Sequence, residues 1–270
     1  PAMLQKVAKE TMFLHFTRHS QFDESAIPII TKAEGHHFWD QNGKKYFDGI
    51  SSLFAVNIGH GRERLAEAAA KQMKQLDYFP IWSNLHAPAI ELSERVLSYA
   101  PKSLSRVFFT TGGGEANETA WKLAKQYFKM TGKPMKHKVL TRAVAYHGTS
   151  HGALSITGIP AFKQMFEPLV PSAFRVPNTN YYRAPHEFAN EDEFGIWAAN
   201  RLEEAILFEG PDTVAAVGAA AAAKAGAAAR AGAAARAGAA AGAGTGSDGI
   251  IGTEPETDAG VPSARGTKKM

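Results

Sequence analysis

The stretch that decides the fold is RVFFTTGGGEANETAWKLAKQYFKMTGKP, which covers residues 106–134. Its first part, Arg106–Thr110, is rich in β-branched and aromatic residues and predicts a short strand. Three consecutive glycines, Gly112 to Gly114, then interrupt the run, and the residues after them have the apolar spacing of an amphipathic helix. The sequence therefore predicts a strand, a glycine turn and a helix in direct succession.

Helices and strands alternate along most of the chain. Two short alternating runs flank Gln41-Asn42-Gly43 and predict a β-hairpin across residues 30–48, because both Asn and Gly tolerate positive φ. The remaining periodic segments predict helices at Arg62–Gln75, Pro88–Ser98 and Phe194–Ile206, and strands at Lys138–Arg142 and residues 211–217. Strands separated by helices at this spacing predict an α/β fold with a mainly parallel sheet.

The composition is that of an ordinary globular protein. Of the 270 residues, 44% are hydrophobic and 21% are charged. The sequence has no cysteine, which excludes disulfides and thiolate metal sites and fits a reducing cytoplasm. The net charge of +4 comes without a clustered basic face, so no nucleic-acid partner is predicted. No apolar run is long enough for a membrane span, and we expect a cytoplasmic protein.

The character of the sequence changes at Gly218. From there to Gly244 it contains only Ala, Gly, Lys and Arg, so nothing larger than a methyl group is available for a core. Three explanations stay open: a flexible linker, a GC-rich gene read out of frame, or a stand-in for unassigned sequence. We therefore expect an N-terminal segment with the hairpin (1–50), a main domain (51–217) and a low-complexity tail (218–270).

The glycines Gly112–Gly114 predict a phosphate-binding turn. A glycine turn that feeds a helix gathers unpaired N–H groups at the positive end of the helix dipole, and the missing side chains let a phosphate approach. A plain tight connection between a strand and a helix explains the same pattern. The nucleotide motif G-x-x-x-x-G-K-[ST] is absent, and Asn117 stands where G-x-G-x-x-G needs its last glycine. Neither nucleotide fingerprint is therefore present.

Two motifs together resemble those of a known family. FFTTGGGEANETAWKLAKQYF, followed by AYHGTSHGALSITG, resembles the class III aminotransferases, which are pyridoxal-phosphate enzymes of fold type I. Those enzymes usually have Ser-Gly-Ser before Glu-Ala-Asn-Glu-Thr-Ala, so Gly112 and Gly114 depart from the commonest serines. The likeness runs from HFTRHS to PDTVAAV, and it is closest to the ω-amino-acid:pyruvate branch.

The resemblance implies a set of cofactor-binding residues. The cofactor is pyridoxal 5'-phosphate, with its phosphate on the main-chain N–H groups of Gly113 and Gly114. Tyr146 would stack on the pyridine ring, with His147 beside it; a partly buried core tyrosine is the plain alternative. His147 and His151 are four residues apart without the Glu of H-E-x-x-H, so no metal site is predicted.

The resemblance also implies substrates and an assembly. Phe54 and Trp82 match positions that line the substrate pocket, although large aromatic residues are as often ordinary core. The substrates would be a small-molecule amine or amino acid and a 2-oxo acid. The protein would form a homodimer or a higher homo-oligomer.

The Schiff-base lysine and the acid that contacts the pyridine nitrogen cannot be assigned in this chain. In the family both lie beyond the strand that here ends at Val217, and no lysine after that strand has the expected motif around it. The catalytic residue is therefore unknown, and the resemblance covers an incomplete large domain. We keep two hypotheses, a transaminase and a fragment of one without catalytic competence, with an aminomutase or an ornithine-type transaminase as alternatives within the family.

Overall fold

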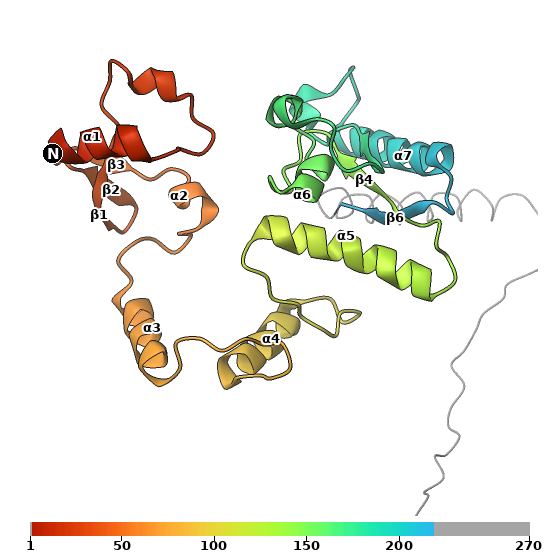
Figure 1. Ribbon diagram of the computed structural model, residues 1–270. Helices are drawn as coiled ribbons and strands as arrows, with labels where there is room; N and C mark the ends of the chain where they lie inside the picture. The colour runs from red at the N-terminus through yellow and green to blue at the C-terminus, as the bar shows by residue number, and fades with distance from the viewer. Residues whose placement is uncertain (1, 219–270) are drawn as a thin grey trace, which may run out of the picture. The chain divides into compact units, whose positions relative to one another are not determined.

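The computed structural model of the chain describes residues 2–218 (Figure 1). These residues form two compact units, the first ending at Val107 and the second beginning at Phe108. Apart from Gly218, the predicted tail of residues 218–270 lies outside the described residues. The predicted division of the chain at residues 50 and 217 stays a prediction.

The first unit combines short helices with one small sheet. The helices predicted at Arg62–Gln75 and Pro88–Ser98 are confirmed to within one residue at each end. An N-terminal helix, which the sequence analysis did not predict, precedes them. The elements of this unit are α1 (Ala2–Thr11), β1 (Ile30–Glu34), β2 (His37–Asp40), β3 (Lys45–Phe47), α2 (Ser51–Phe54), α3 (Glu63–Gln75) and α4 (Ala87–Tyr99).

The predicted hairpin is present as part of an antiparallel sheet with the order β1-β2-β3. Gly43 has a φ of 78° in the turn between β2 and β3, as the Asn-Gly pair predicted. The Asp40 carboxylate fixes this turn because it accepts the N–H groups of Asn42 and Lys44 and the hydroxyl of Tyr46. The turn at Gly35, with a φ of 58°, adds a second hairpin that was not predicted separately.

Residues 51–54 form a left-handed turn, which is rare for residues other than glycine. Their φ angles are 51°, 48°, 60° and 68°. The Asp48 carboxylate accepts hydrogen bonds from the backbone and the hydroxyl of Ser52 and lies 2.8 Å from His60 Nε2. These contacts lower the pKa of Asp48 to about 2, with the Ser52 N–H as the largest cause. Asp48 therefore holds the turn that carries Phe54.

The second unit is built on a parallel sheet with the order β5-β4-β6, so the predicted parallel sheet is confirmed. Residues 139–141 of the central strand are all buried, as expected for a strand that is covered on both faces. The strands are β4 (Lys138–Arg142), β5 (Ala173–Val176) and β6 (Val214–Val217), and the helices are α5 (Gly113–Met130), α6 (His151–Ile156) and α7 (Glu191–Glu209).

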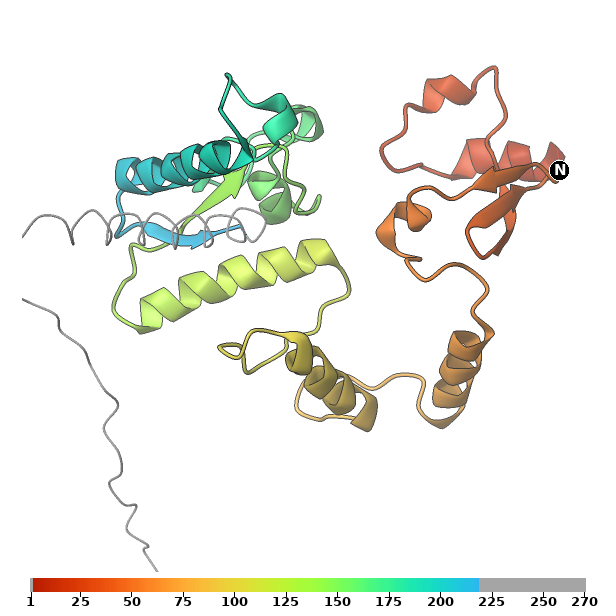
Figure 2. The same cartoon turned by 180° about the vertical axis from the view of Figure 1, so that it is seen from behind.

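The sheet lies between α5 on one face and α7 on the other (Figures 1 and 2). On the α5 face, Trp121 packs with Val139 of β4 and Ile156 of α6 in one buried cluster. The Trp121 indole donates to the carbonyl of His137, 3.0 Å away, so its polar edge is also satisfied. Burial of this large side chain fixes α5 against the sheet.

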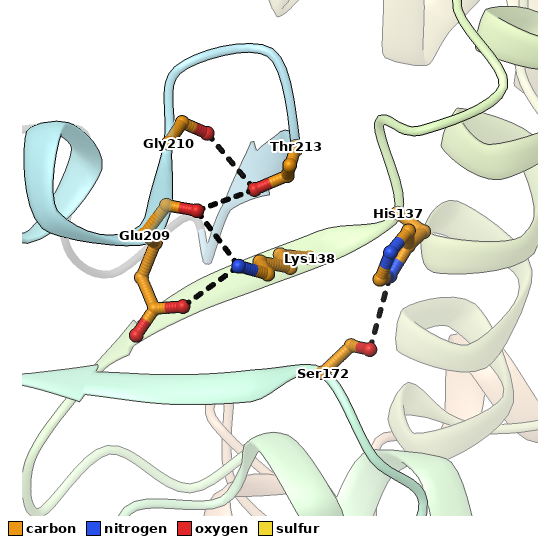
Figure 3. A network of polar contacts seen from close by, with 6 residues as sticks. All are labelled: His137, Lys138, Ser172, Glu209, Gly210 and Thr213. Carbon is orange, nitrogen blue, oxygen red and sulfur yellow. Dashed lines mark hydrogen bonds and ion pairs between the residues drawn. The ribbon is translucent and has the colours of Figure 1, made fainter.

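A polar network fixes the N-terminal end of β4 (Figure 3). Lys138 Nζ lies 2.9 Å from Glu209 Oε2 and donates to the Glu209 carbonyl at 2.7 Å. The Thr213 hydroxyl donates to the same carbonyl and to that of Gly210. On the other side of β4, His137 Nδ1 lies 3.0 Å from Ser172 Oγ. The network joins the end of α7 and the starts of β5 and β6 to the central strand.

The prediction of a strand at Arg106–Thr110 is wrong for the described residues. Among residues 2–218, no strand pairs with this segment, which runs without regular structure into α5. Its residue types fit a strand, but a strand also needs a neighbour for its backbone N–H and C=O groups. The short helix α6 and the strand β5 were not predicted from the sequence.

Candidate functional site

The glycine turn, Gly112–Gly114, begins α5. Gly112 is the N-cap with extended backbone, and no side chain accepts a hydrogen bond from the first turn at this position. The first N–H groups of a helix have no partner within the helix, and Gly113 and Gly114 hold the first two of these positions in α5. A β-carbon built on Gly112 or Gly113 would meet no neighbouring atom of the described chain within 4 Å. The helix therefore begins with backbone donors beside open space.

A carboxylate closes the N-terminal side of the glycine turn. Glu115 accepts the N–H group of Thr111 at 3.0 Å and the Thr111 hydroxyl as well. These two hydrogen bonds lower the pKa of the Glu115 carboxyl, the hydroxyl being the larger cause. This arrangement resembles a capping box, in which the acid of the first turn reaches back along the chain. It holds the negative charge of Glu115 toward the residue before the N-cap.

The loop Tyr146–Ser150 faces the glycine turn across an open pocket of about 490 Å³. The Tyr146 side chain is about half exposed (55%) and contacts Phe162 edge-on, with ring centroids 6.2 Å apart. The pocket is therefore polar backbone on one side and an aromatic ring on the other. Its lining residues are Thr111, Gly112, Gly113, Gly114, Glu115, Asn117, Tyr146, His147, Gly148, Thr149 and Ser150.

The two walls of the pocket meet at a pair of glycines. Gly148 has a φ of 126°, and a β-carbon built on it would lie 2.7 Å from the Gly114 Cα atom and 3.0 Å from the Ala153 Cβ atom. Both the backbone conformation and the lack of space require glycine here. A β-carbon on Gly114, by contrast, would make ordinary contacts at 3.6 Å to Ser150 Oγ and 3.8 Å to Gly148 Cα.

His147 anchors the loop to the sheet. Its side chain is buried, and Nε2 lies 2.9 Å from Thr141 Oγ1 on β4. Its backbone N–H donates to Thr157 Oγ1, whose hydroxyl in turn contacts the carbonyl of Gly148. Burial, with a smaller contribution from the charge of Arg142, lowers the pKa of His147. Burial thus favours the neutral form of this ring, and the contact with Thr141 anchors it to β4.

Two polar side chains of α5, Asn117 and Glu118, connect the walls and were not predicted from the sequence. Asn117 Nδ2 donates to the carbonyl of His147 at 2.8 Å, and Glu118 Oε1 accepts the N–H groups of Gly152 and Ala153 at 2.8 and 3.1 Å. These partners lie 30 to 35 residues further along the chain. Nothing in the local sequence identifies such partners, because helical periodicity reports only neighbours three or four residues apart.

The structure brings four predicted site residues, Gly113, Gly114, Tyr146 and His147, together in the pocket. Phe54 lies at the end of the left-handed turn, and Trp82 lies between α3 and α4. Both belong to the first unit and are largely exposed there, at 73% and 91%. The part of the chain that the structure describes contains no group of three or more potential metal ligands. No helix among residues 2–218 is long and apolar enough to cross a membrane.

The fold is shared with solved transaminases of fold type I. The profile of the aminotransferase class-III family matches residues 20–222, and the chain belongs to this family. Class III aminotransferases use pyridoxal 5'-phosphate. The predicted family and fold class are thus confirmed.

The individual proteins that the chain resembles are also aminotransferases. A probable aminotransferase of Mycobacterium tuberculosis is 57% identical, covering 80% of this chain and 46% of the relative. A putrescine–pyruvate aminotransferase of Pseudomonas aeruginosa is 35% identical, with 78% and 46% covered. An ω-transaminase of Pseudomonas jessenii, solved in complex with PMP, has a TM-score of 0.76 at 32% identity, with 79% and 48% covered. The chain thus spans about half the length of the proteins it matches.

The residues of the pocket fit pyridoxal phosphate. A phosphate needs several donors and no obstructing side chain, and the glycine turn offers both. A pyridine ring needs an accessible aromatic face. Two of the lining residues are aromatic, and Tyr146 is the accessible one because His147 is buried. Glu115 is the one carboxylate among the lining residues, and its hydrogen bonds hold it toward Thr111.

Proposed function

We propose that the protein is a pyridoxal-phosphate-dependent aminotransferase, which moves an amino group between a small-molecule amine or amino acid and a 2-oxo acid. Membership of the class III family supports this activity. The single observation that carries it is the open pocket in which the glycine turn of α5 faces the loop Tyr146–Ser150. A site of this kind offers donors for a phosphate and a face for a ring in one place.

Each residue of the pocket has a role in this proposal. The N–H groups of Gly113 and Gly114 bind the phosphate, aided by the dipole of α5. Tyr146 stacks on the ring and fixes its plane, while His147 holds the loop to β4. When bound, pyridoxal phosphate supplies a carbonyl for the amino group and a ring that withdraws electrons from the reacting carbon. The chain's own residues orient it.

The relatives and two aromatic residues support the proposed substrate class. The relatives include a putrescine–pyruvate aminotransferase and ω-transaminases, which supports an amine as donor and a 2-oxo acid as acceptor. We assign Phe54 and Trp82 to the substrate pocket, because both present a large apolar surface that the first unit leaves exposed. Apolar walls of this kind suit the carbon skeleton of an amine.

A second candidate function is a binding module without catalysis. None of the eleven residues that line the pocket is a lysine, so within residues 2–218 the pocket has no amine to hold the cofactor covalently. The chain as it stands would then bind the cofactor through its phosphate and ring alone.

The assembly and the location are also proposals. Many large apolar side chains of the first unit are exposed in the single chain, which supports a homodimer or a higher homo-oligomer that covers them. They include Leu53, Ile58, Tyr78 and Leu85. A cytoplasmic location is consistent with the sequence, which contains no cysteine.

The experiment uses both forms of the cofactor with the full chain. Titration with pyridoxamine phosphate, which has no aldehyde, measures the pocket without any contribution from a lysine. Saturable one-to-one binding supports the proposal, and no binding at millimolar concentration contradicts it. Reduction with borohydride in the presence of pyridoxal phosphate, followed by peptide mass spectrometry, then separates the two functions. A stoichiometric pyridoxyl-lysine with amine-dependent turnover would contradict the binding module.

A further inference from the structure

The first observation concerns Asn117, whose side chain bridges the two walls of the pocket. Its Nδ2 atom donates to the carbonyl of Gly113 at 3.1 Å and to that of His147 at 2.8 Å. One of these carbonyls belongs to the glycine turn, and the other belongs to the residue next to Tyr146. A single amide group therefore links the glycine turn to the loop that carries the aromatic ring.

Glu118, the next residue of α5, fixes the far end of the same loop. Its Oε1 atom accepts the N–H groups of Gly152 and Ala153, the first-turn donors of α6. A β-carbon built on Gly152 would lie 2.4 Å from Glu118 Oε2, so the carboxylate rests directly against bare backbone. Burial alone would raise the pKa of Glu118, but hydrogen bonds from Ser150 and from these N–H groups lower it. The carboxylate is thus held ionised where α6 begins.

The other end of α6 is fixed independently of α5. Lys163 Nζ is buried and donates to the carbonyls of Ser155 and Thr157 at 3.0 and 3.1 Å, and Arg175 also contacts both carbonyls. Positive charge at the C-terminal end and negative charge at the N-terminal end both suit the helix dipole. Because these contacts already hold α6, the specific effect of Glu118 falls on the residues between Tyr146 and Ala153.

We propose that Asn117 and Glu118 are positioning residues, which hold the loop Tyr146–Ser150 at a fixed distance from the N–H groups of Gly113 and Gly114. The pocket then accepts the phosphate and the aromatic ring of one rigid ligand at the same time. This inference rests on the proposed function. The inference predicts different behaviour for two kinds of ligand. A free phosphate uses only the glycine turn, whereas pyridoxamine phosphate contacts both the glycine turn and Tyr146 and needs them at the correct distance.

The test compares the two ligands on the full chain. Loss of hydrogen bonds to a charged group weakens an interaction about tenfold or more. We therefore expect Glu118→Ala to lower the affinity for pyridoxamine phosphate about tenfold, and the affinity for inorganic phosphate less than about twofold. Glu118→Gln, whose carbonyl oxygen can still accept, should restore part of the loss. Asn117→Ala should behave like Glu118→Ala. Glu203→Gln, on the exposed face of α7, is the matched control for Glu118→Gln.

A loss of general stability would lower both affinities together, and that outcome overturns the inference. The inference is also overturned if the wild-type chain binds pyridoxamine phosphate and Glu118→Ala binds it with unchanged affinity. If the wild-type chain binds no pyridoxamine phosphate, the proposed function fails instead. Amide hydrogen exchange then tests the positioning without a ligand. Glu118→Ala should speed exchange at Gly152 and Ala153 but not in β4, and unchanged exchange at Gly152 would overturn the inference.

Discussion

The substitution Gly113→Val tests the phosphate site most directly, because it changes the ligand's space and leaves the protein's own packing intact. A β-carbon at this position meets no neighbouring atom within 4 Å, and Gly113 does not have a positive φ. Valine is also a better helix former than glycine by a few tenths of a kcal/mol. The thermal midpoint of unfolding should therefore stay the same or rise slightly.

The affinity for pyridoxamine phosphate should fall in the same variant. The branched side chain of valine would occupy the open space in front of the glycine turn and prevent a phosphate from reaching at least one N–H donor. A hydrogen bond to a charged group contributes about 1.5–3 kcal/mol. The expected loss is therefore about 10-fold to 100-fold in the dissociation constant.

Isothermal titration calorimetry of the full chain measures this loss, with Gly195→Val as the control. Gly195 lies in α7, where a β-carbon also meets nothing within 4 Å, so the same substitution is made away from the pocket. Unchanged affinity in Gly113→Val would show that the phosphate binds elsewhere. A drop in the thermal midpoint together with the affinity would refute the reasoning about open space.

Three further predictions concern the other residues of the pocket. Gly114→Ser, whose β-carbon has room, should bind phosphate about threefold to tenfold more tightly through a restored hydroxyl, as titration would show. Gly148→Ala should lower the free energy of unfolding by about 2 kcal/mol or more, measured with urea, because it meets Gly114 in a strained conformation. Burial lowers the pKa of His147 below 6.5, so the unfolded chain takes up the proton first and stability falls as the pH drops below about 6.5. His147→Gln should flatten this part of the pH profile, and an unchanged slope would contradict the assignment.

The sequence predicted much of the second unit, because its signals are local. The glycines at the start of α5, the apolar and β-branched residues of β4 and the apolar spacing of α7 each involve residues close together along the chain. The strand at Arg106–Thr110 failed for a different reason. Its residue types were right, but a strand exists only where another strand pairs with it, and no single segment of sequence contains that information.

The candidate site shows the same division. Its glycines and Tyr146 could be found from motifs, because a phosphate turn and the family resemblance both leave a local pattern. Asn117 and Glu118 lie in one of these motifs, but their partners could not be predicted, since these lie more than 29 residues away along the chain. The left-handed turn at residues 51–54 was equally hidden, because it contains no glycine and depends on Asp48 and His60.

The sequence by itself determined the longer helices α3, α4, α5 and α7, the strands β4 and β6, the place of the glycine turn and the family, since each of these leaves a pattern among neighbouring residues. The tertiary structure decided which wall faces the turn. The 2.7 Å approach between a β-carbon on Gly148 and the Gly114 Cα atom, and the bridge from Asn117 to His147, exist only after α5 has packed on the sheet through Trp121. Packing of distant segments, driven by burial of apolar surface, thus converts two separate motifs into one pocket.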